Sequence, residues 1–326
     1  MTVFALLTSI PDRDYSHFAM GGFDSEINGR DHLVARKSKS LSSKRGAVMR
    51  KAVSFAGAVL CFLALGVLAP AQFKSEEIAQ REQWEQFLVT AEIVKAERLG
   101  EGVTKPWRLY LKKGDTEHTA AWKNPSGKTD GIYDSWKFEI AAYRLDKLLD
   151  LNAVPVTVER ELKGKAGCLS LWAESRTSLL KMEEAGESIP EAAMPKTDEM
   201  KYITRLWDCL IANDDRTQQN ILFTDDWRTI LIDHSRAFQS DRKYTRQLVF
   251  GTDGLYTLDD GRPILFRRVP RRLVEKITGL TADAIRQAVG LYLTDKEIQA
   301  VVARIPLITK EIDALIKQFG ESNVLY

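Results

Sequence analysis

The sequence predicts an α+β domain of two lobes, a small β-rich lobe followed by a larger helical lobe. Residues 92–123 contain short alternating segments that are typical of strands. Residues 200–238 indicate an amphipathic helix, a polar loop and two short strands. Residues 271–319 follow the helical period. We expect four helices there, at residues 271–278, 281–293, 294–304 and 306–319, with a capping box at Thr294 and Glu297 and with Pro306 in a first helical turn.

The composition is that of an ordinary globular protein without a strongly basic region. Of 326 residues, 44% are apolar and 28% are charged, and the formal net charge is +2. Residues 1–71 hold nine Lys/Arg and five Asp/Glu, which leaves 38 basic against 40 acidic residues, a net charge of −2. No nucleic-acid partner is therefore expected. Histidines and cysteines are not clustered, so no zinc site is expected, although Cys168 and Cys209 could form a disulfide.

An uncharged apolar run of twenty residues, 52–71, dominates the amino-terminal part. Basic residues precede it, and Ala69-Pro-Ala71 has the small-x-small pattern of a cleavage site. Residues 49–71 are either a cleaved signal peptide or a single transmembrane anchor, for which about 20 residues suffice. The preceding basic residues predict that the rest of the chain lies outside the cytoplasm, secreted or anchored to the cytoplasmic membrane. Residues 1–48 are expected to be a disordered or mis-assigned extension, because Met49-Arg-Lys begins a normal signal peptide.

The small lobe is expected over residues 72–174. A strand that begins at Glu92 should turn near Gly100 and Gly102 and return as Trp107–Leu111. Such a hairpin could cover phosphate groups, although a plain hairpin is the preferred interpretation. The segment Thr119–Lys123 is predicted to be a strand that ends in a lysine.

A helix is predicted over residues 134–150, because Phe138, Ala141, Leu145 and Leu149 share one face. Asp134 is its expected N-cap, and Glu139 lies in its first turns. A strand should follow at residues 168–174. Residues 175–198, with one glycine and two prolines, are expected to be an exposed segment between the lobes, and the large lobe should span residues 199–326.

Three polar residues in the segment 203–238 have the types that phosphoryl transfer requires. Asp215 and Asn220 stand five positions apart, and two apolar strands with a turn between them should carry Asp233 back beside Asn220. Carboxylate and amide oxygens are hard ligands for Mg²⁺, and a further carboxylate can accept the proton of an attacking hydroxyl. A surface loop rich in Asn, Asp and Gln is the alternative for the loop alone.

The pattern Asp215-Arg216 with Asn220, followed by Ile232-Asp233-His234, resembles the D-R-H-x-x-N … I-D-H pattern of atypical protein-kinase-like families. These include phosphatidylinositol 3-/4-kinase-like, HipA-like and secretory-pathway kinases. The resemblance spans residues 92–238 and is sharpest over its last third. Thr217 stands where those families usually have His, which leaves the subfamily open.

The resemblance implies a two-lobed kinase-like fold and a role for each candidate residue. Lys123 would contact the α- and β-phosphates of ATP and Glu139 would fix it by an ion pair, while Asn220 and Asp233 would bind the metal. Asp215 would be the base or the orienting acid, with Asp214 as its rival. Arg216 would either neutralise a neighbouring carboxylate or form a surface ion pair. The remaining cofactor contacts would come from Gly100, Gly102 and, in the strand that enters the hinge, Glu174.

The function predicted from these residues is an ATP- and Mg²⁺-dependent phosphotransferase that acts on a hydroxyl of a protein, a lipid or a small molecule. Its partners would be the nucleotide, a hydroxyl-bearing substrate and, if residues 52–71 are uncleaved, the membrane. The alternative is a non-catalytic kinase-fold binding or scaffold protein outside the cytoplasmic membrane. Adenylylation is a third reaction that the same residues could support. The segment 239–261, polar and marked by glycines, is predicted to be a mobile loop at the place of an activation segment.

Overall fold

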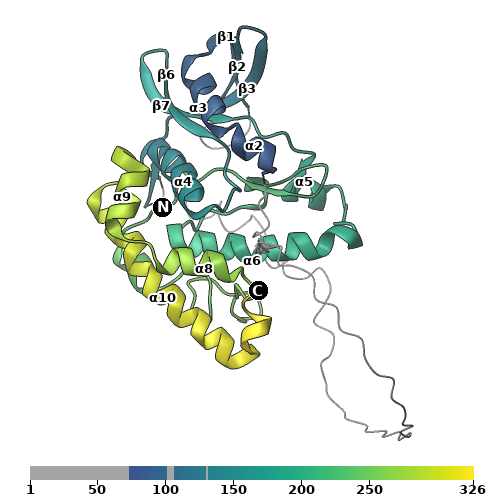
Figure 1. The fold of residues 1–326 in the computed structure, drawn as a ribbon, viewed down its shortest axis with the longest axis vertical. Coiled ribbons are helices and arrows are strands. Elements are labelled where there is room, and N and C mark those ends of the chain that lie inside the picture. Colours follow the sequence, from purple (N-terminus) through teal and green to yellow (C-terminus); the bar gives the residue numbers. More distant parts are fainter. Residues whose placement is uncertain (1–72, 101–105, 130) are drawn as a thin grey trace, which may run out of the picture. The chain divides into compact units, whose positions relative to one another are not determined.

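A five-stranded antiparallel sheet forms the centre of the small lobe (Figure 1). The computed structural model describes residues 73–100, 106–129 and 131–326. The predicted hairpin is present as β1 and β2, and Gly100 follows β1, whereas Gly102 lies outside the described residues. The strand order is β1-β2-β3-β7-β6, with β1 at Glu92–Arg98, β2 at Trp107–Lys113, β3 at Thr116–Lys123, β6 at Thr157–Leu162 and β7 at Lys165–Leu171.

The helix after this hairpin begins later than the sequence predicts. Helix α4 spans Trp136–Leu149, and its N-cap is Ser135, whose hydroxyl accepts a hydrogen bond from Lys137 N at 3.3 Å. Asp134, the expected N-cap, instead lies in β5 (Ile132–Ser135), which pairs with β4 (Ser126–Thr129). The Asp134 carboxylate lies 3.5 Å from Arg236 instead of binding the first turn of α4.

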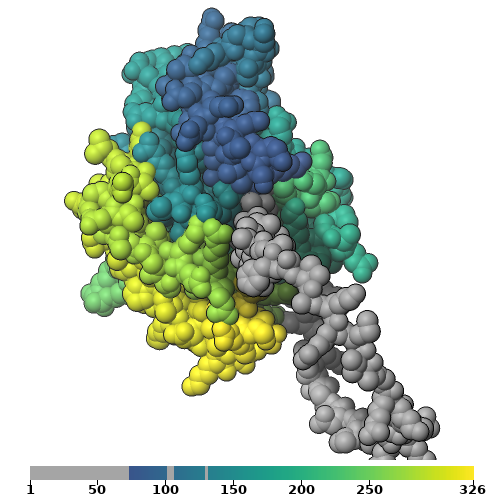
Figure 2. All heavy atoms as spheres, in the orientation of Figure 1, coloured from purple at the N-terminus to yellow at the C-terminus, as the bar shows by residue number. Residues whose placement is uncertain are grey.

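Two amino-terminal helices, α2 (Ser75–Ala79) and α3 (Arg81–Thr90), complete the small lobe. Helix α3 packs against β6 and β7. In Figure 2, the dark blue atoms of this part of the chain cover the sheet. Arg81 and Asp146, both buried, join α3 to α4 with an Nη2–Oδ1 distance of 3.5 Å. The Asp146 carboxylate also accepts hydrogen bonds from the amides of Ala153 and Val154, so it connects α4 with the start of the next strand.

The segment 175–198 is more ordered and more buried than expected. It contains β8 (Thr177–Ser178), α5 (Leu179–Glu184), the 3-10 turn η1 (Glu191–Ala193) and the start of α6 (Met194–Ile211). Leu179 and Met182 are buried, because α5 packs beside the loop that carries Asn220. The prediction that this whole segment is exposed is therefore wrong, while the lobe boundaries themselves stay predictions.

The predicted hairpin of the large lobe is present as β9 (Ile221–Phe223) and β10 (Thr229–Leu231). The strands are antiparallel, with Leu231 opposite Ile221, and β8 pairs with the other edge of β9. Beyond β10, Ile232 N donates a hydrogen bond to Asn220 O at 3.1 Å. This bond places Asp233 beside Asn220, as the sequence predicts.

Among the carboxyl-terminal helices, α10 (Asp295–Phe319) packs against α6. One long helix replaces the two predicted at residues 294–304 and 306–319, because α10 continues through Pro306. Pro306 is exposed, and buried residues such as Ile305 and Ile308 continue on one face past it, so packing compensates for the missing hydrogen bond. The capping box at Thr294 and Glu297 is confirmed. The helices are α7 (Arg242–Arg246), α8 (Arg271–Thr278), α9 (Ala282–Val289) and α10 (Asp295–Phe319), with 3-10 turns η2 (Gln218–Asn220), η3 (Gly290–Tyr292) and η4 (Glu321–Asn323).

Two further sequence expectations have a structural outcome. Cys168 and Cys209 are both buried free thiols, so the disulfide between them is absent. Among the described residues, no helix combines the length and the apolar character needed to cross a membrane. The apolar run 52–71 lies outside the described residues.

Candidate active site

Lys123, the last residue of β3, is the centre of the candidate site. Its Nζ lies 3.0 Å from Glu139 Oε1 on α4 and 2.9 Å from Asp233 Oδ1 beyond β10. The ion pair that the sequence predicts between Lys123 and Glu139 is present. Burial alone would lower the pKa of Lys123, but the charges of Asp233 and Glu139 raise that pKa above its ordinary value. The ammonium is therefore charged and joins the two lobes.

Glu139 is held on both of its oxygens. Its Oε2 accepts a hydrogen bond from His234 N at 3.0 Å, while Oε1 faces Lys123. Burial would raise the pKa of Glu139, but Lys123 and His234 lower it well below its usual range. Because Glu139 contacts residues on either side of the interlobe segment, its carboxylate fixes α4 against the strand end that carries Asp233.

A buried polar chain continues from His234 into the large lobe. His234 Nε2 lies 2.9 Å from Arg216 Nη2, and Arg216 makes two hydrogen bonds to Asp208 on α6, at 3.1 and 3.0 Å. Burial and the Arg216 charge lower the pKa of His234, so its imidazole is neutral at pH 7 and accepts from Arg216. Of the two roles considered for Arg216, neutralising a neighbouring carboxylate is the one observed, and the guanidinium is fully buried.

Asp215 lies in the loop after α6, and Asn220 is the last residue of the 3-10 turn that follows, η2 (Gln218–Asn220). Asn220 Nδ2 donates a hydrogen bond to the Asp215 backbone carbonyl at 3.4 Å, and Asp215 N donates to Asn213 Oδ1. The Asp215 side chain is 40% exposed and lies 3.6 Å from Arg236 Nη1. Burial raises the pKa of Asp215, Arg236 opposes this shift, and the neighbouring charge of Asp233 adds to it.

The rival acid, Asp214, has a different environment. The hydroxyls of Tyr244 and Tyr256 both donate to Asp214 Oδ2, the second at 3.2 Å. These bonds direct Asp214 towards the segment 239–261, whereas the Asp215 carboxylate lies 3.6 Å from Arg236, which in turn lies 3.5 Å from Asp134. These ion pairs connect Asp215, rather than Asp214, with the strand before α4 and with the residues that follow Asp233.

The oxygen atoms of Asn220 and Asp233 fit a hard divalent cation. The Asn220 amide nitrogen is bound to a carbonyl, which leaves its side-chain oxygen as an acceptor. Asp233 has φ 58°, a left-handed conformation that Asp tolerates better than most residues. Its Oδ1 accepts a hydrogen bond from the Ser235 hydroxyl at 3.3 Å. Among the described residues, no group of three or more His, Cys, Asp or Glu could hold a metal ion. A cation here would thus take its other ligands from phosphate and water, as Mg²⁺ commonly does.

Two charged residues at the site, Arg236 and Asp134, are not among the site residues that the sequence predicts. Arg236 lies 3.5 Å from Asp134 and 3.6 Å from Asp215, so it links the strand before α4 to the Asp215 loop. Its place three positions after Asp233 was the only available signal. The sequence predicts a capping role for Asp134, because Asp before a helical pattern usually has that role.

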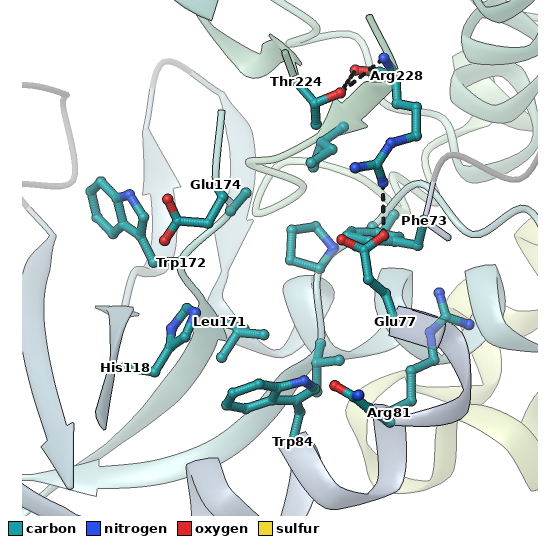
Figure 3. Close-up of a pocket in the computed structure, with 16 residues that line it drawn as sticks. Phe73, Glu77, Arg81, Trp84, His118, Leu171, Trp172, Glu174, Thr224 and Arg228 are labelled. Carbon is teal, nitrogen blue, oxygen red and sulfur yellow. Dashed lines mark hydrogen bonds and ion pairs between the residues drawn. The ribbon is translucent and has the colours of Figure 1, made fainter. Parts of the chain in front are cut away.

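Within the described ranges, the structure shows no hydrogen bond or ion pair between Glu174 or Gly100 and the Lys123 cluster. This cluster comprises Lys123, Glu139, Asp233, Asp134, Asp215 and Arg236. Gly100 follows the end of β1, where Leu99 N donates to Pro106 O at 2.8 Å. The Glu174 side chain lines a pocket of about 220 Å³ with Phe73, Trp84 and Trp172 (Figure 3). No residue of the Lys123 cluster lines that pocket. The cofactor roles of Gly100, Gly102 and Glu174 stay predictions.

Comparison with known proteins gives similarity in structure only. No protein-family model matches the chain, and no curated protein sequence matches it either. The structure of Fam20 from hydra with sugar has 16% sequence identity and a TM-score of 0.53, covering 76% of this chain and 92% of that chain. The Golgi casein kinase with Mn/ADP bound has 14% identity and a TM-score of 0.51, covering 76% and 79%. The described chain thus has the atypical protein-kinase-like fold that its sequence predicts.

Proposed function

We propose that this chain is a phosphotransferase that moves the γ-phosphoryl group of ATP to a hydroxyl group, with Mg²⁺ as cofactor. The observation that carries the proposal is the position of Lys123, between Glu139 of the small lobe and Asp233 of the large lobe. A lysine held in this way presents a fixed positive charge where the lobes meet. Phosphoryl transfer depends on such positioned charges more than on covalent chemistry.

The charge of the cluster supports a divalent cation. Lys123 and Arg236 supply two positive charges, while Glu139, Asp233, Asp215 and Asp134 supply four negative ones, so the formal sum is −2. When bound, Mg²⁺ would compensate this charge and that of the phosphates. Asn220 and Asp233 are the residues that would hold it. Lys123 would contact the α- and β-phosphates and keep the nucleotide oriented.

Asp215 is the residue proposed to act on the acceptor hydroxyl. Its carboxylate is partly exposed, so a substrate can reach it, and its pKa is raised by burial and by neighbouring acids. A carboxylate with a raised pKa is a better proton acceptor than an ordinary aspartate. Arg236, at 3.6 Å, keeps the group oriented and limits that increase.

The direct test is transfer of radiolabel by the purified full-length chain. We expect label from γ-labelled ATP, but not from α-labelled ATP, to reach a hydroxyl-bearing acceptor or the chain itself, and we expect chelation of Mg²⁺ to stop the transfer. Transfer of label from α-labelled ATP would instead establish adenylylation. Nucleotide binding without transfer from either position would establish a non-catalytic binding protein and overturn the proposal.

We further propose that the catalytic part lies outside the cytoplasm. The support is the apolar run 52–71 with basic residues before it. One structural neighbour is a Golgi kinase, which agrees with this location. An alkaline phosphatase fused after Tyr326 should be active only when residues 49–71 are present. Equal phosphatase activity of a fusion that lacks them would contradict the proposed location.

A further inference from the structure

A second pocket, of about 640 Å³, lies on the large lobe between α7, the turn after it and the second half of α10. Four exposed cations line it, Arg242, Lys243 and Arg246 on α7 and Lys310 on α10. In the described part of the chain, none of these four has a carboxylate partner at ion-pair distance. The pocket therefore presents positive charge that the protein itself does not neutralise.

The acids of the pocket do not compensate this charge. Glu311 accepts hydrogen bonds from Thr252 N at 2.7 Å and from Thr252 Oγ1 at 2.9 Å. It holds the turn at Gly251, whose φ of 135° favours glycine and whose backbone lies close to the Glu311 carboxylate. Asp253 is the other acid in the lining, so four cations face two acids, a formal sum of +2.

The spacing of the cations fits an extended acidic polypeptide. Arg242 and Arg246 are four residues apart on one helix, so they share a face at a separation of about 6 Å. In an extended peptide, alternate side chains lie on one side about 6.8 Å apart, so two acidic side chains can meet the two guanidinium groups. Each guanidinium can bind a carboxylate or a phosphate in a bidentate way.

The same helix also contacts the loop that carries Asp215. Tyr244 is buried on α7 between these cations. Its hydroxyl donates a hydrogen bond to Asp214, the residue before Asp215. Tyr256 donates to the same oxygen at 3.2 Å, and Lys243 lies over the Tyr256 ring at 5.8 Å. A ligand in the pocket is thereby positioned by the element that also orients the candidate catalytic loop.

We propose that this pocket binds an acidic segment of a polypeptide acceptor and places its hydroxyl at Asp215. The inference rests on the proposed function, because it names the substrate class of that same site. The negative groups are carboxylates or phosphates, since both match the arginine side chains.

The test measures binding of two fluorescent peptides to the full-length chain by anisotropy, one rich in glutamate and one rich in phosphoserine. The pocket variant is Arg246→Gln with Lys310→Gln. The control variant is Lys165→Gln with Lys296→Gln, which changes the net charge equally at exposed positions outside the pocket. Because one exposed ion pair changes affinity by up to about fivefold, we expect the pocket variant, which lacks two of the cations, to bind ~10-fold more weakly and the control less than ~2-fold.

Each outcome is decisive. Tighter binding of the phosphoserine peptide would identify phosphates as the recognised groups, and tighter binding of the glutamate peptide would identify carboxylates. Equal affinities of the pocket and control variants would overturn the inference, as would an unchanged KM of the pocket variant for an acidic serine peptide. If the wild type binds the peptide but transfers no phosphoryl group, the proposed function fails and the anion-binding pocket remains.

Discussion

Asp233→Ala will lose Mg²⁺-dependent nucleotide binding, whereas Asp215→Ala will bind ATP like the wild type and lose phosphoryl transfer. The two acids differ in position. Asp233 lies 2.9 Å from Lys123 and beside Asn220, where the metal is proposed, while Asp215 lies on the loop side of the cluster near Arg236. Loss of a ligand at a metal site removes charge stabilisation of several kcal/mol, so we expect a decrease of about 10²-fold or more for Asp233→Ala.

Calorimetric titration with ATP, with and without Mg²⁺, checks the binding half of this prediction, and a radiolabel assay checks transfer. Asp225→Ala is a matched control, because Asp225 is an exposed acid in the turn between β9 and β10. It should bind and transfer like the wild type. Wild-type nucleotide affinity in Asp233→Ala would show that Asp233 is not a metal ligand. Retained transfer in Asp215→Ala would show that Asp215 does not act on the acceptor hydroxyl.

Lys123→Met and Glu139→Gln should each reduce transfer by about 10²-fold, and the double variant should lose little more than either alone. The reason is geometric, since Glu139 Oε1 lies 3.0 Å from the Lys123 ammonium, which is the group proposed to contact the phosphates. Once Lys123 is absent, Glu139 has no ammonium to orient. Groups that act as one unit give strongly non-additive effects. Steady-state kcat/KM values of the three variants measure this coupling.

A second ion pair on α4 serves as the control. Lys147 Nζ and Glu85 Oε1 also lie 3.0 Å apart, but both side chains are considerably more exposed than Lys123 and Glu139. Exposed pairs contribute only ~0–1 kcal/mol, so Lys147→Met with Glu85→Gln should change transfer by less than about twofold. If the losses of the Lys123 and Glu139 variants simply multiplied in the double variant, the two residues would act independently and the assigned pairing would be wrong.

The sequence by itself determined those parts of the site that depend on neighbours along the chain. The hairpin of β9 and β10 follows from two short apolar strands around Asp225-Asp226, and it places Asp233 beside Asn220. The lysine at the end of β3 and the acid in the first turn of α4 follow from strand and helix periods. The fold resemblance rests on the same local patterns. The roles of these residues in binding and transfer are still predictions.

Only the tertiary structure decided the features that depend on packing between distant segments. The single helix α10 continues through Pro306 because its buried face is shared with α6, which no local rule on proline reveals. Arg236 meets Asp134 across about a hundred residues of chain, and the charges on α7 and α10 converge on one pocket. The physical reason is that a local pattern specifies which face of an element is apolar, whereas the partners of a charged side chain depend on how elements far apart in the sequence pack together.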